Sequence, residues 1–469
     1  MMQASLRQVA AWSGSLSFPS EPEAGDLRVA GVSTDTRTLA AGQLFVPLAG
    51  ERFDGHDHLA AAEAAGAAAA LWQADRPLPD TRLPLIVVAD TLAALQRLAA
   101  SYLASIGAKA VGVTGSNGKT TTKDLVASVL STGYKVTKTE GNFNNHIGLP
   151  LTILRAPADT EVLVLEMGMS GRGEIALLTR IAKPVVAIIT NIGESHLLQL
   201  GSRRNIARAK LEIAEGLQPG GTLVYNGDEP LLAEELAAAP LPEGTRAVTF
   251  GQGEGCALRL GRLEGTAQGS RFTVADDPDT EYELPVPGRH NALNALAAVA
   301  IGRLFGLSAG RIAEGLRTAK LTGMRIERTT ARSGATVLND AYNASPTSMR
   351  AAIDLLGGLA PEAGGRKYLV IGDMLELGPE EAAFHAGIGR YATPDKTDFL
   401  FAYGPLSLHA VREAERVFPP GAVRHFADKR ELIGELLARL GPADLALVKA
   451  SRGMKLEEVV FALQRGAVE

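Results

Sequence analysis

A glycine-rich loop that ends in lysine and threonine is the strongest chemical signal in the sequence. The segment VTGSNGKTT, residues 113–121, follows an apolar run and precedes a helical pattern. Glycines let backbone amides converge on phosphate oxygens, and the following helix N-terminus adds its dipole. Lys119 would reach the β- and γ-phosphates of a nucleotide, and the Thr120 hydroxyl would bind Mg²⁺. Val113 stands where the common pattern has glycine, and an ordinary glycine-rich turn remains the alternative.

One lysine lies on the apolar face of a predicted helix. Over residues 203–217, Ile206, Ile213 and Leu217 share a face at helical spacing, and Lys210 shares it with them. An inward lysine is costly unless it is neutralised or paired, and desolvation lowers its pKa and makes the amine nucleophilic. Such an amine could react with CO₂ to give a carbamate that binds Mg²⁺. The pattern alone favours the alternative, a lysine whose stem covers apolar surface while its amine reaches water.

An acid and an imidazole follow two further apolar runs. Glu166 lies near the end of EVLVLEMG, and His196 follows VVAIITNIGES. Carboxylate oxygen suits the hard Mg²⁺ ion, whereas imidazole is a less usual ligand for it. A solvated strand-end carboxylate and a hydrogen-bonded loop histidine are the alternatives for these residues taken singly. Their combination with a phosphate loop favours a shared site.

A parallel α/β sheet would bring these residues together. Short apolar runs alternate with helical segments from residue 109 onward, which predicts parallel strands joined by crossover helices. Sites in such sheets form at the carboxyl ends of the strands. The expected strands are residues 109–115, 161–167, 184–192 and 221–225, and the first helix runs from 119 to 130.

Two further blocks flank this central one, so the chain is expected to form three domains, over residues 1–107, 108–320 and 321–469. Residues 245–287 contain strand-like pieces rich in Gly and Pro, which indicate an antiparallel or edge addition to the central sheet. The first domain is expected to hold helices at 58–71 and 91–106, and the third to hold strands at 335–339, 367–372, 398–403 and 444–449.

Composition excludes several classes of protein. The chain has 469 residues, 46% hydrophobic and 21% charged, with a net charge of −5, which does not favour a nucleic-acid partner. Its one cysteine, Cys256, rules out an intrachain disulfide framework and fits a reducing compartment. The first residues lack a long apolar run, and no stretch reaches the ~20 apolar residues of a membrane span. A soluble globular protein of a reducing compartment, without membrane insertion, is therefore expected.

The residues assembled so far resemble the Mur ligase family. VTGSNGKTTTKDL is similar to the ATP loop of that family, and GNFNNHIGLPLTIL, residues 141–154, to the adjacent segment near substrate and γ-phosphate. Residues 165–175 and 190–197 are similar to its metal-binding strands. Residues 207–213 are similar to the segment that carries a carbamylated lysine, and this likeness reverses the preference stated above for Lys210.

The resemblance extends through the third block. PGRHNALNALAA, residues 287–298, is similar to the adenine-contacting segment; the Gly-Met-Arg that ends at Arg325, and residues 339–349, are similar to the hinge and to ATP contacts of the third domain. Residues 33–62, and VIGDMLELG at 370–378, most resemble members that join D-alanyl-D-alanine to UDP-N-acetylmuramoyl-tripeptide. DAYNASP also resembles their version, and the Asp-Asn-Pro-Arg signature of the diaminopimelate-adding members is absent.

The family implies a UDP-substrate domain, a central ATPase domain with a parallel sheet and a Rossmann-like C-terminal domain. It implies a cytoplasmic, monomeric ligase of peptidoglycan precursor synthesis that uses ATP and Mg²⁺ and proceeds through an acyl phosphate. The catalytic residues so implied are Lys119, Glu166, His196 and Lys210. The metal ligands are Thr120, Glu166, His196 and carbamylated Lys210. The nucleotide contacts are Gly115, Ser116, Asn117, Gly118, Lys119, Thr120, Thr121, Asn291, Arg325, Asp340 and Asn343.

For the UDP-substrate, Ser33, Thr34 and Arg37 are candidates, since a guanidinium suits a diphosphate or a carboxylate. Asn144 and Asn145 would orient the precursor or the γ-phosphate. A surface turn is the alternative for the first three.

Two other functions remain open. One is a different amide ligase of the same superfamily, which adds another amino acid, or glutamate to folate. The other is a nucleotide-dependent switch without ligase activity, against which the presence of Lys119, Glu166, His196 and Lys210 argues.

Overall fold

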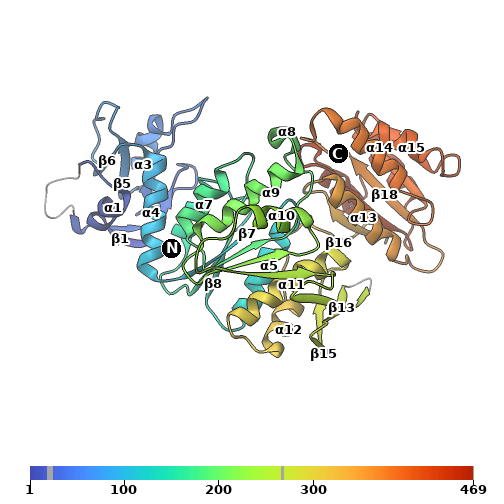
Figure 1. The fold of residues 1–469 in the computed structure, drawn as a ribbon. Helices are drawn as coiled ribbons and strands as arrows, with labels where there is room; N and C mark the ends of the chain where they lie inside the picture. Colours follow the sequence, from blue (N-terminus) through green and yellow to red (C-terminus); the bar gives the residue numbers. More distant parts are fainter. Residues whose placement is uncertain (18–24, 266–268, 468–469) are drawn as a thin grey trace.

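The computed structural model describes residues 1–17, 25–265 and 269–467 and has three α/β units that follow one another along the chain. Figure 1 shows the first unit (blue) and the last (orange to red) on opposite sides, with the middle unit (green and yellow) between and below them. The predicted α/β class with three domains is confirmed. No helix in the described ranges is long and apolar enough to cross a membrane.

The first unit contains a four-stranded parallel sheet and a two-stranded antiparallel ribbon. The sheet has the order β3 (Val32–Ser33), β4 (Leu44–Phe45), β5 (Ala69–Gln73) and β6 (Leu85–Val88), and the ribbon pairs β1 (Gln3–Ser5) with β2 (Arg28–Ala30). Its helices are α1 (Leu6–Ser13), η1 (Gly55–His58), α3 (Leu59–Ala64) and α4 (Thr91–Ile106).

The helix predicted over residues 58–71 is wrong at its C-terminal end. Helix α3 stops at Ala64, and Gly66 then adopts a φ of 85°, which ends the helix. Residues 69–73 instead form β5, in which Leu71 is fully buried between neighbouring strands. The alanine-rich composition favours a helix locally, but the hydrogen bonds to β4 and β6 decide the structure.

The middle unit is built on a nine-stranded sheet that is parallel except at one end. In spatial order its strands are β15 (Asp277–Leu284), β14 (Ser270–Val274), β13 (Leu258–Gly265), β12 (Arg246–Gly251), β11 (Thr222–Asn226), β10 (Val186–Ile189), β7 (Lys109–Thr114), β9 (Val162–Glu166) and β8 (Val136–Lys138). The last two pairings at the β15 end are antiparallel, which confirms the predicted addition over 245–287; residues 266–268 of that range lie outside the described residues.

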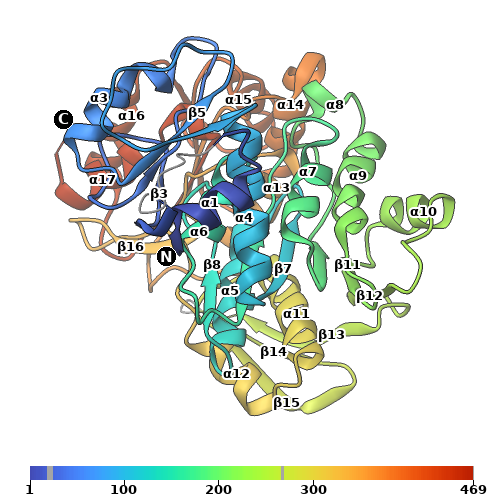
Figure 2. The ribbon, with the colours of Figure 1, turned by 90° about the vertical axis from the view of Figure 1, so that its left-hand side faces the viewer.

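Helices cover both faces of this sheet. They are α5 (Lys119–Ser131), α6 (Gly148–Arg155), α7 (Glu174–Ala182), α8 (Leu197–Leu200), α9 (Arg203–Leu211), η2 (Glu212–Gly216), α10 (Pro230–Ala238), α11 (Arg289–Leu304) and α12 (Ala309–Arg317). Along β9, Val162 and Val164 pack with α5 and α11, whereas Leu163 and Leu165 pack on the opposite side with α4 and α6. Figure 2 shows α4 of the first unit standing against the middle one, where it contacts α6 and α7.

The third unit has a six-stranded sheet in the order β16 (Glu327–Thr330), β17 (Thr336–Asp340), β21 (Leu445–Lys449), β18 (Lys367–Gly372), β19 (Phe399–Tyr403) and β20 (Val423–Phe426). Only β16 is antiparallel to its neighbour. The helices are α13 (Pro346–Gly358), η3 (Gly378–Glu380), α14 (Glu381–Tyr391), α15 (Leu408–Ala414), α16 (Lys429–Arg439), η4 (Arg452–Met454) and α17 (Glu457–Arg465).

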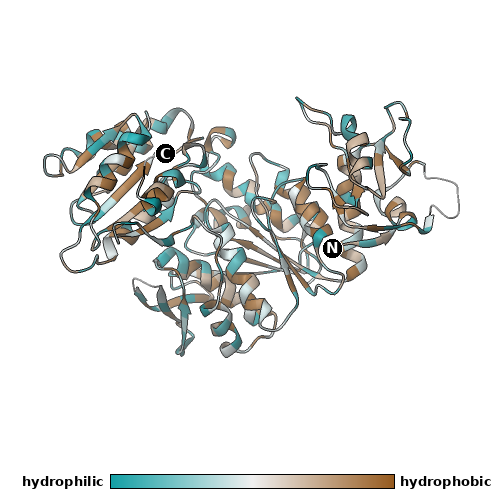
Figure 3. Ribbon diagram, turned by 180° about the vertical axis from the view of Figure 1, so that it is seen from behind, coloured by the Kyte–Doolittle hydropathy of each residue, from teal (hydrophilic) through white to brown (hydrophobic). Residues whose placement is uncertain are grey.

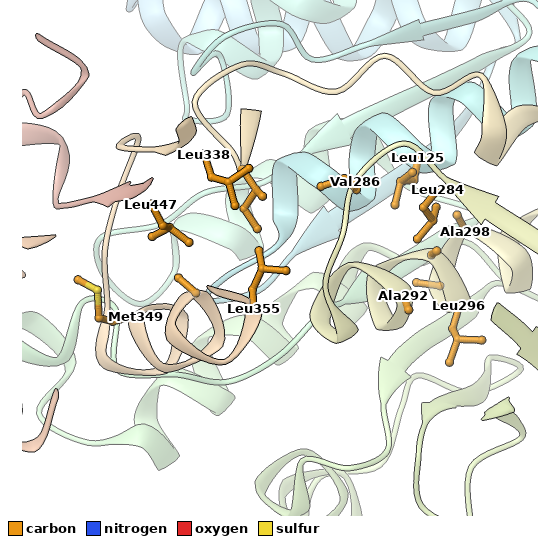
Figure 4. Close-up of a cluster of buried hydrophobic side chains, with 14 of the residues drawn as sticks. Leu125, Leu284, Val286, Ala292, Leu296, Ala298, Leu338, Met349, Leu355 and Leu447 are labelled. Carbon is orange, nitrogen blue, oxygen red and sulfur yellow. The ribbon is translucent and has the colours of Figure 1, made fainter. Parts of the chain in front are cut away.

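A single buried apolar cluster spans the middle and third units. It includes Leu125 and Leu296 from the helices of the middle unit and Leu338, Met349 and Leu355 from the third (Figure 4). Figure 3 shows that hydrophobic residues (brown) are frequent in the strands inside each unit, whereas hydrophilic residues (teal) are concentrated on exposed helices and loops. The contact buries apolar surface of both the middle and the third unit, which favours their association. The cluster therefore stabilises the position of the third unit beside the phosphate loop.

Candidate active site

The phosphate loop leads from β7 into α5, in the strand, turn and helix order that the sequence predicts. Gly115 and Gly118 have φ values of 149° and 79° in this turn. A Cβ on Gly115 would lie 1.8 Å from the Thr190 hydroxyl oxygen, so a side chain does not fit there. The Lys119 ammonium donates to the carbonyl oxygens of Gly115 (2.7 Å) and Ser116 (3.4 Å).

The end of the neighbouring strand β10 holds this loop in shape. The backbone carbonyl of Asn191 accepts a hydrogen bond from the backbone N–H of Ser116 at 3.0 Å. The side-chain oxygen of Asn191 accepts another from the backbone N–H of Asn117 at 2.9 Å. The Thr190 hydroxyl donates to the Asn117 carbonyl at 2.5 Å. The sequence predicts a site residue in this segment at His196 but not at Asn191. The available signal was a polar pair at the end of a buried strand that adjoins β7.

Glu166 ends β9, directly beside β7, and is 3% exposed. Its carboxylate accepts a hydrogen bond from the Thr120 hydroxyl at 2.8 Å and another from the Asn144 amide at 2.9 Å. The first residue of α5 after Lys119 and the end of β9 therefore present adjacent oxygen atoms. Hydroxyl and carboxylate oxygens are ligands that Mg²⁺ accepts.

His196 precedes α8 and adopts a left-handed backbone conformation with a φ of 66°. Burial, followed by the positive charges of Lys119 and Lys210, lowers its pKa to about 4. The imidazole is therefore neutral at physiological pH, the form in which histidine binds metals. Its Nδ1 lies 3.4 Å from a carboxylate oxygen of Glu376 in the third unit.

Lys210 on α9 points inward, as the helical periodicity predicts, and is 1% exposed. Burial and the charge of Lys119 hold its pKa well below the usual range. On the opposite side of α9, Arg204 and Arg208 donate to Glu235 of α10 at 2.6 and 2.7 Å, which fixes the orientation of the helix.

The third unit contributes a second group of polar residues. The Arg325 guanidinium lies over the Tyr342 ring, 4.3 Å from its centroid, and its Nε is buried without a hydrogen-bond partner. The Lys449 ammonium donates to the Asp340 carboxylate at 2.7 Å and to the Asn343 carbonyl at 2.9 Å. Asp340 and Lys449 are direct partners across β17 and β21.

Lys449 and His290 belong to this group but are not among the residues that the sequence predicts. The signal for Lys449 was a charged residue at the end of a buried strand, over residues 444–449. Burial lowers the pKa of His290 to about 4, with Asp340 acting to raise it and Lys449 to lower it further.

One cavity of about 430 Å³ collects most of the predicted residues. Those that line it are Ser116, Asn117, Gly118, Lys119, Thr120, Thr121, Asn144, Asn145, Glu166, His196, Asn291, Arg325, Asp340 and Asn343. Lys449, His290 and Asn191 line it as well. The residues come from both the middle and the third unit, so the cavity lies where the two meet.

Five predicted residues do not line this cavity. Gly115, at the start of the loop, and Lys210 are not among the lining residues, although the charge of Lys210 acts on His196, which does line the cavity. Ser33 ends β3 in the first unit, and Thr34 and Arg37 follow this strand; Arg37 forms an exposed ion pair with Asp35 at 2.7 Å. The structure thus groups the nucleotide and metal candidates but not the three candidates for the UDP-substrate.

Three family models match successive parts of the chain. Residues 28–103 match the Mur ligase family catalytic domain, 113–302 the Mur ligase middle domain, and 324–452 the Mur ligase glutamate ligase domain. Together the matched segments include the end of β7 and all of α5, β9 and β17, which carry the loop and the strand ends described above.

Full-length relatives agree with these matches. UDP-N-acetylmuramoyl-tripeptide–D-alanyl-D-alanine ligase of Bacillus subtilis is 50% identical over 92% of both chains, and that of Escherichia coli is 37% identical over 95% of this chain and 96% of the relative. A crystal structure of MurF from Acinetobacter baumannii superposes with a TM-score of 0.87, 30% identity and 99% coverage of both chains. MurF ligase from Thermotoga maritima in complex with ADP superposes with a TM-score of 0.81 and 28% identity over 93% of this chain and 98% of the other. The chain belongs to the Mur ligase family.

Proposed function

We propose that this chain joins D-alanyl-D-alanine to UDP-N-acetylmuramoyl-tripeptide with ATP, in the cytoplasmic synthesis of peptidoglycan precursors. The observation that carries the proposal is the single cavity in which the phosphate loop and Glu166 of the middle unit face Arg325 and Asp340 of the third. A phosphate loop opposite cationic and acidic groups suits phosphoryl transfer. The relatives supply the identity of the two substrates joined.

In the first step, the terminal carboxylate of the tripeptide attacks the γ-phosphorus of ATP. A bond forms between a carboxylate oxygen and the γ-phosphorus, and the bond from the γ-phosphorus to the oxygen that bridges it to the β-phosphate breaks. The products are ADP and an acyl phosphate of the tripeptide. Lys119 and Arg325 line the cavity and bring positive charge to the transferring group. Phosphoryl transfer needs mostly positioning and charge neutralisation, which these side chains supply.

The donor set fits Mg²⁺ at the phosphate loop. The Thr120 hydroxyl and the Glu166 carboxylate, which lie 2.8 Å apart, would hold one ion, and His196 with carbamylated Lys210 would hold a second. No cluster of three or more His, Cys, Asp or Glu side chains occurs among the described residues, so phosphate oxygens and water would complete the coordination. When bound, the ions neutralise phosphate charge.

The burial of Lys210 supports the carbamylation of its amine. Because its pKa is held well below the usual range, the amine is available in its neutral, nucleophilic form. Attack of the amine on CO₂ forms a nitrogen–carbon bond, and loss of one proton leaves a carbamate anion. That anion would place negative charge near the positive Lys119.

In the second step, the neutral amine of D-alanyl-D-alanine attacks the acyl carbon. The tetrahedral intermediate collapses to the amide as the bond from carbon to the phosphate oxygen breaks and phosphate leaves, and the nitrogen releases one proton to water. Contacts between the middle and third units would exclude water that otherwise hydrolyses the acyl phosphate.

The UDP-substrate would extend from this cavity to the first unit. Asn144 and Asn145 line the cavity and would orient the end of the precursor near the γ-phosphate. Ser33, Thr34 and Arg37 would bind the UDP moiety. The Arg37 guanidinium would leave its ion pair with Asp35 and pair with a phosphate of the substrate instead.

A substrate-panel assay tests the proposal. Purified protein is given ATP, Mg²⁺ and UDP-N-acetylmuramoyl-tripeptide, and phosphate release is measured with D-alanyl-D-alanine, single amino acids, or L-glutamate with a folate. We expect release that depends on the tripeptide and on D-alanyl-D-alanine, and none from Lys119→Ala, which removes the cation of the phosphate loop. Release only with L-glutamate and a folate would refute the proposed substrates. Nucleotide binding without release in any arm would favour a switch protein.

A further inference from the structure

The segment that joins the middle unit to the third has unusual backbone geometry around Arg325. It runs from the end of α12 to the start of β16. Met324 and Ile326, on either side of Arg325, both have a φ of 58°. Residues other than glycine rarely adopt this left-handed backbone region, and a β-branched residue such as isoleucine is especially ill suited to it. Such backbone persists only where surrounding contacts hold it.

One of the contacts that hold this segment comes from the phosphate-loop helix. Asp124 lies on α5, five residues after Lys119, and is 1% exposed. One of its carboxylate oxygens accepts hydrogen bonds from both the backbone N–H and the hydroxyl of Thr322, each at 2.8 Å. Thr322 precedes Arg325 by three residues. Helix α5 therefore follows the phosphate loop at its N-terminus and, in its second turn, forms hydrogen bonds to the connecting segment.

Two lysines keep Asp124 in its charged form. Its other carboxylate oxygen lies 2.5 Å from the Lys138 ammonium and 3.1 Å from that of Lys123. Although burial opposes ionisation, these charges and the bonds from Thr322 leave the pKa of Asp124 below its usual value. Lys123 is itself fixed by donation to the Thr139 carbonyl at 2.7 Å. The carboxylate is thus a rigid, charged acceptor, and hydrogen bonds to charged groups are stronger than neutral ones.

The hydrogen bonds between Asp124 and Thr322 affect the position of the Arg325 guanidinium. Arg325 lines the nucleotide cavity, and its charge helps to lower the pKa of Lys119, which places the two cations near each other. Its Nε is buried without a partner, so the side chain retains hydrogen-bonding capacity. Two cations that face one cavity are stabilised by an anion placed between them.

We propose that Asp124 is a positioning residue which, by holding Thr322, fixes Arg325 in the cavity for the triphosphate of ATP. This inference rests on the proposed nucleotide site but not on the identity of the amino substrate. It couples the phosphate loop and the connecting segment through one helix, so that Lys119 and Arg325 approach the same phosphates from opposite sides of the cavity.

The matched pair Thr322→Ser and Thr322→Val tests the inference. Serine keeps both donors to Asp124, whereas valine has nearly the same shape and loses the hydroxyl. We expect the Kd of a non-hydrolysable ATP analogue with Mg²⁺, measured by calorimetry, to rise about tenfold for valine and by less than about twofold for serine. KM for UDP-tripeptide should not change in either variant.

A double-mutant cycle with Arg325→Ala separates positioning from a general loss of structure. If Thr322 acts through Arg325, then Thr322→Val should not weaken analogue binding further in the Arg325→Ala background. Asp124→Asn, which removes the charge, gives a second route to the same cycle. A valine variant that binds like wild type, or one that weakens binding equally in both backgrounds, overturns the inference. Weakened binding in a protein that releases no phosphate with D-alanyl-D-alanine would sustain it and refute the proposed substrates.

Discussion

Two lysines of the middle unit, Lys119 and Lys210, have pKa values lowered by burial, and the positive charge of Lys119 lowers the pKa of Lys210 further. His196 responds to both charges and stays neutral above a pKa of about 4. The three groups therefore share one electrostatic environment, although Lys210 does not line the cavity. At this scale, helical periodicity places Lys210 on the apolar face of its helix, but the pattern alone favours an amine that reaches water, and only the family resemblance favours a buried amine.

The carbamate proposal predicts a rescue experiment at Lys210. Lys210→Ala should reduce ligase turnover by about 100-fold or more, because an anion at the metal site is lost. Acetate or formate should restore part of the activity by supplying a carboxylate in the vacated space. Lys210→Arg is the matched control: it keeps a positive charge, cannot form the carbamate and leaves no space, so it should stay inactive with or without the added acid. Full activity of Lys210→Ala would remove the carbamate from the mechanism.

The two histidines of the cavity predict a pH dependence of stability. His196 and His290 each have a folded pKa of about 4, below the unfolded value of about 6.5. Between those values the unfolded chain binds more protons, so the free energy of unfolding should fall as pH drops from about 6.5 to about 4 and should not depend on these groups above that window. Urea unfolding at pH 7.5, 6 and 5 measures the effect. His290→Asn should show a shallower decline; an unchanged slope would contradict the assignment for His290.

Other residues of the site were beyond prediction from a single sequence. Lys449 and Asp340 are 109 positions apart and meet only because β21 inserts beside β17. Strand order is a property of the whole sheet and leaves no local pattern. Asn191 was hidden in the same way, because its role depends on β10 lying beside β7.

At the scale of elements, strand ends do most of the positioning. β9 and β10 flank β7, and their ends carry Glu166 and the Thr190–Asn191 pair beside the phosphate loop. The strands expected at 109–115, 161–167, 184–192 and 221–225 are present within a few residues, because buried apolar runs in a parallel sheet are distinctive. The helix over 58–71 failed because alanine gives no signal for the non-local pairing of β5.

The β17 and β21 pair predicts the effect of removing Lys449. Lys449→Met should leave the Asp340 carboxylate without its buried partner and destabilise the protein by about 3 kcal/mol. KM for ATP should rise about tenfold, because the Asp340–Asn343 segment loses both of its bonds to this side chain. Urea unfolding and steady-state kinetics measure the two effects.

The double variant Lys449→Met with Asp340→Asn is the control for this prediction. It removes the unpaired charge, so stability should return in part while KM for ATP stays high. Unchanged KM in a folded Lys449→Met protein would show that the pair is only structural.

At the scale of the whole molecule, the third unit is docked on the middle one through polar contacts around the phosphate loop. Glu194 accepts from the backbone N–H and the hydroxyl of Thr347 in the first turn of α13, at 3.2 and 2.6 Å. Ser345 donates to the Asn117 side chain at 3.0 Å. A carboxylate at a helix N-terminus is favoured by the helix dipole. These contacts join segments from separate domains, so sequence patterns alone do not predict them.

Removing the Glu194 contact should loosen this docking. We expect the radius of gyration of nucleotide-free Glu194→Ala to increase by about 1 Å from about 23 Å, because α13 loses the acceptor at its N-terminus. Small-angle X-ray scattering measures the change, and a saturating ATP analogue should reduce it. Glu215→Ala, which removes an exposed pair with Arg180 in the same unit, should leave the radius unchanged. Equal radii for the Glu194 variant and wild type would mean that the apolar cluster alone sets the docking.

The bond from Ser345 to Asn117 also has a consequence for inhibition. Asn117 belongs to the loop that cradles phosphate, whereas Ser345 caps a helix of another domain. A compound that wedged itself between these two side chains would keep the domains apart without resembling adenine. Substitutions in the expected adenine-contacting segment, residues 287–298, would leave both of these side chains unchanged.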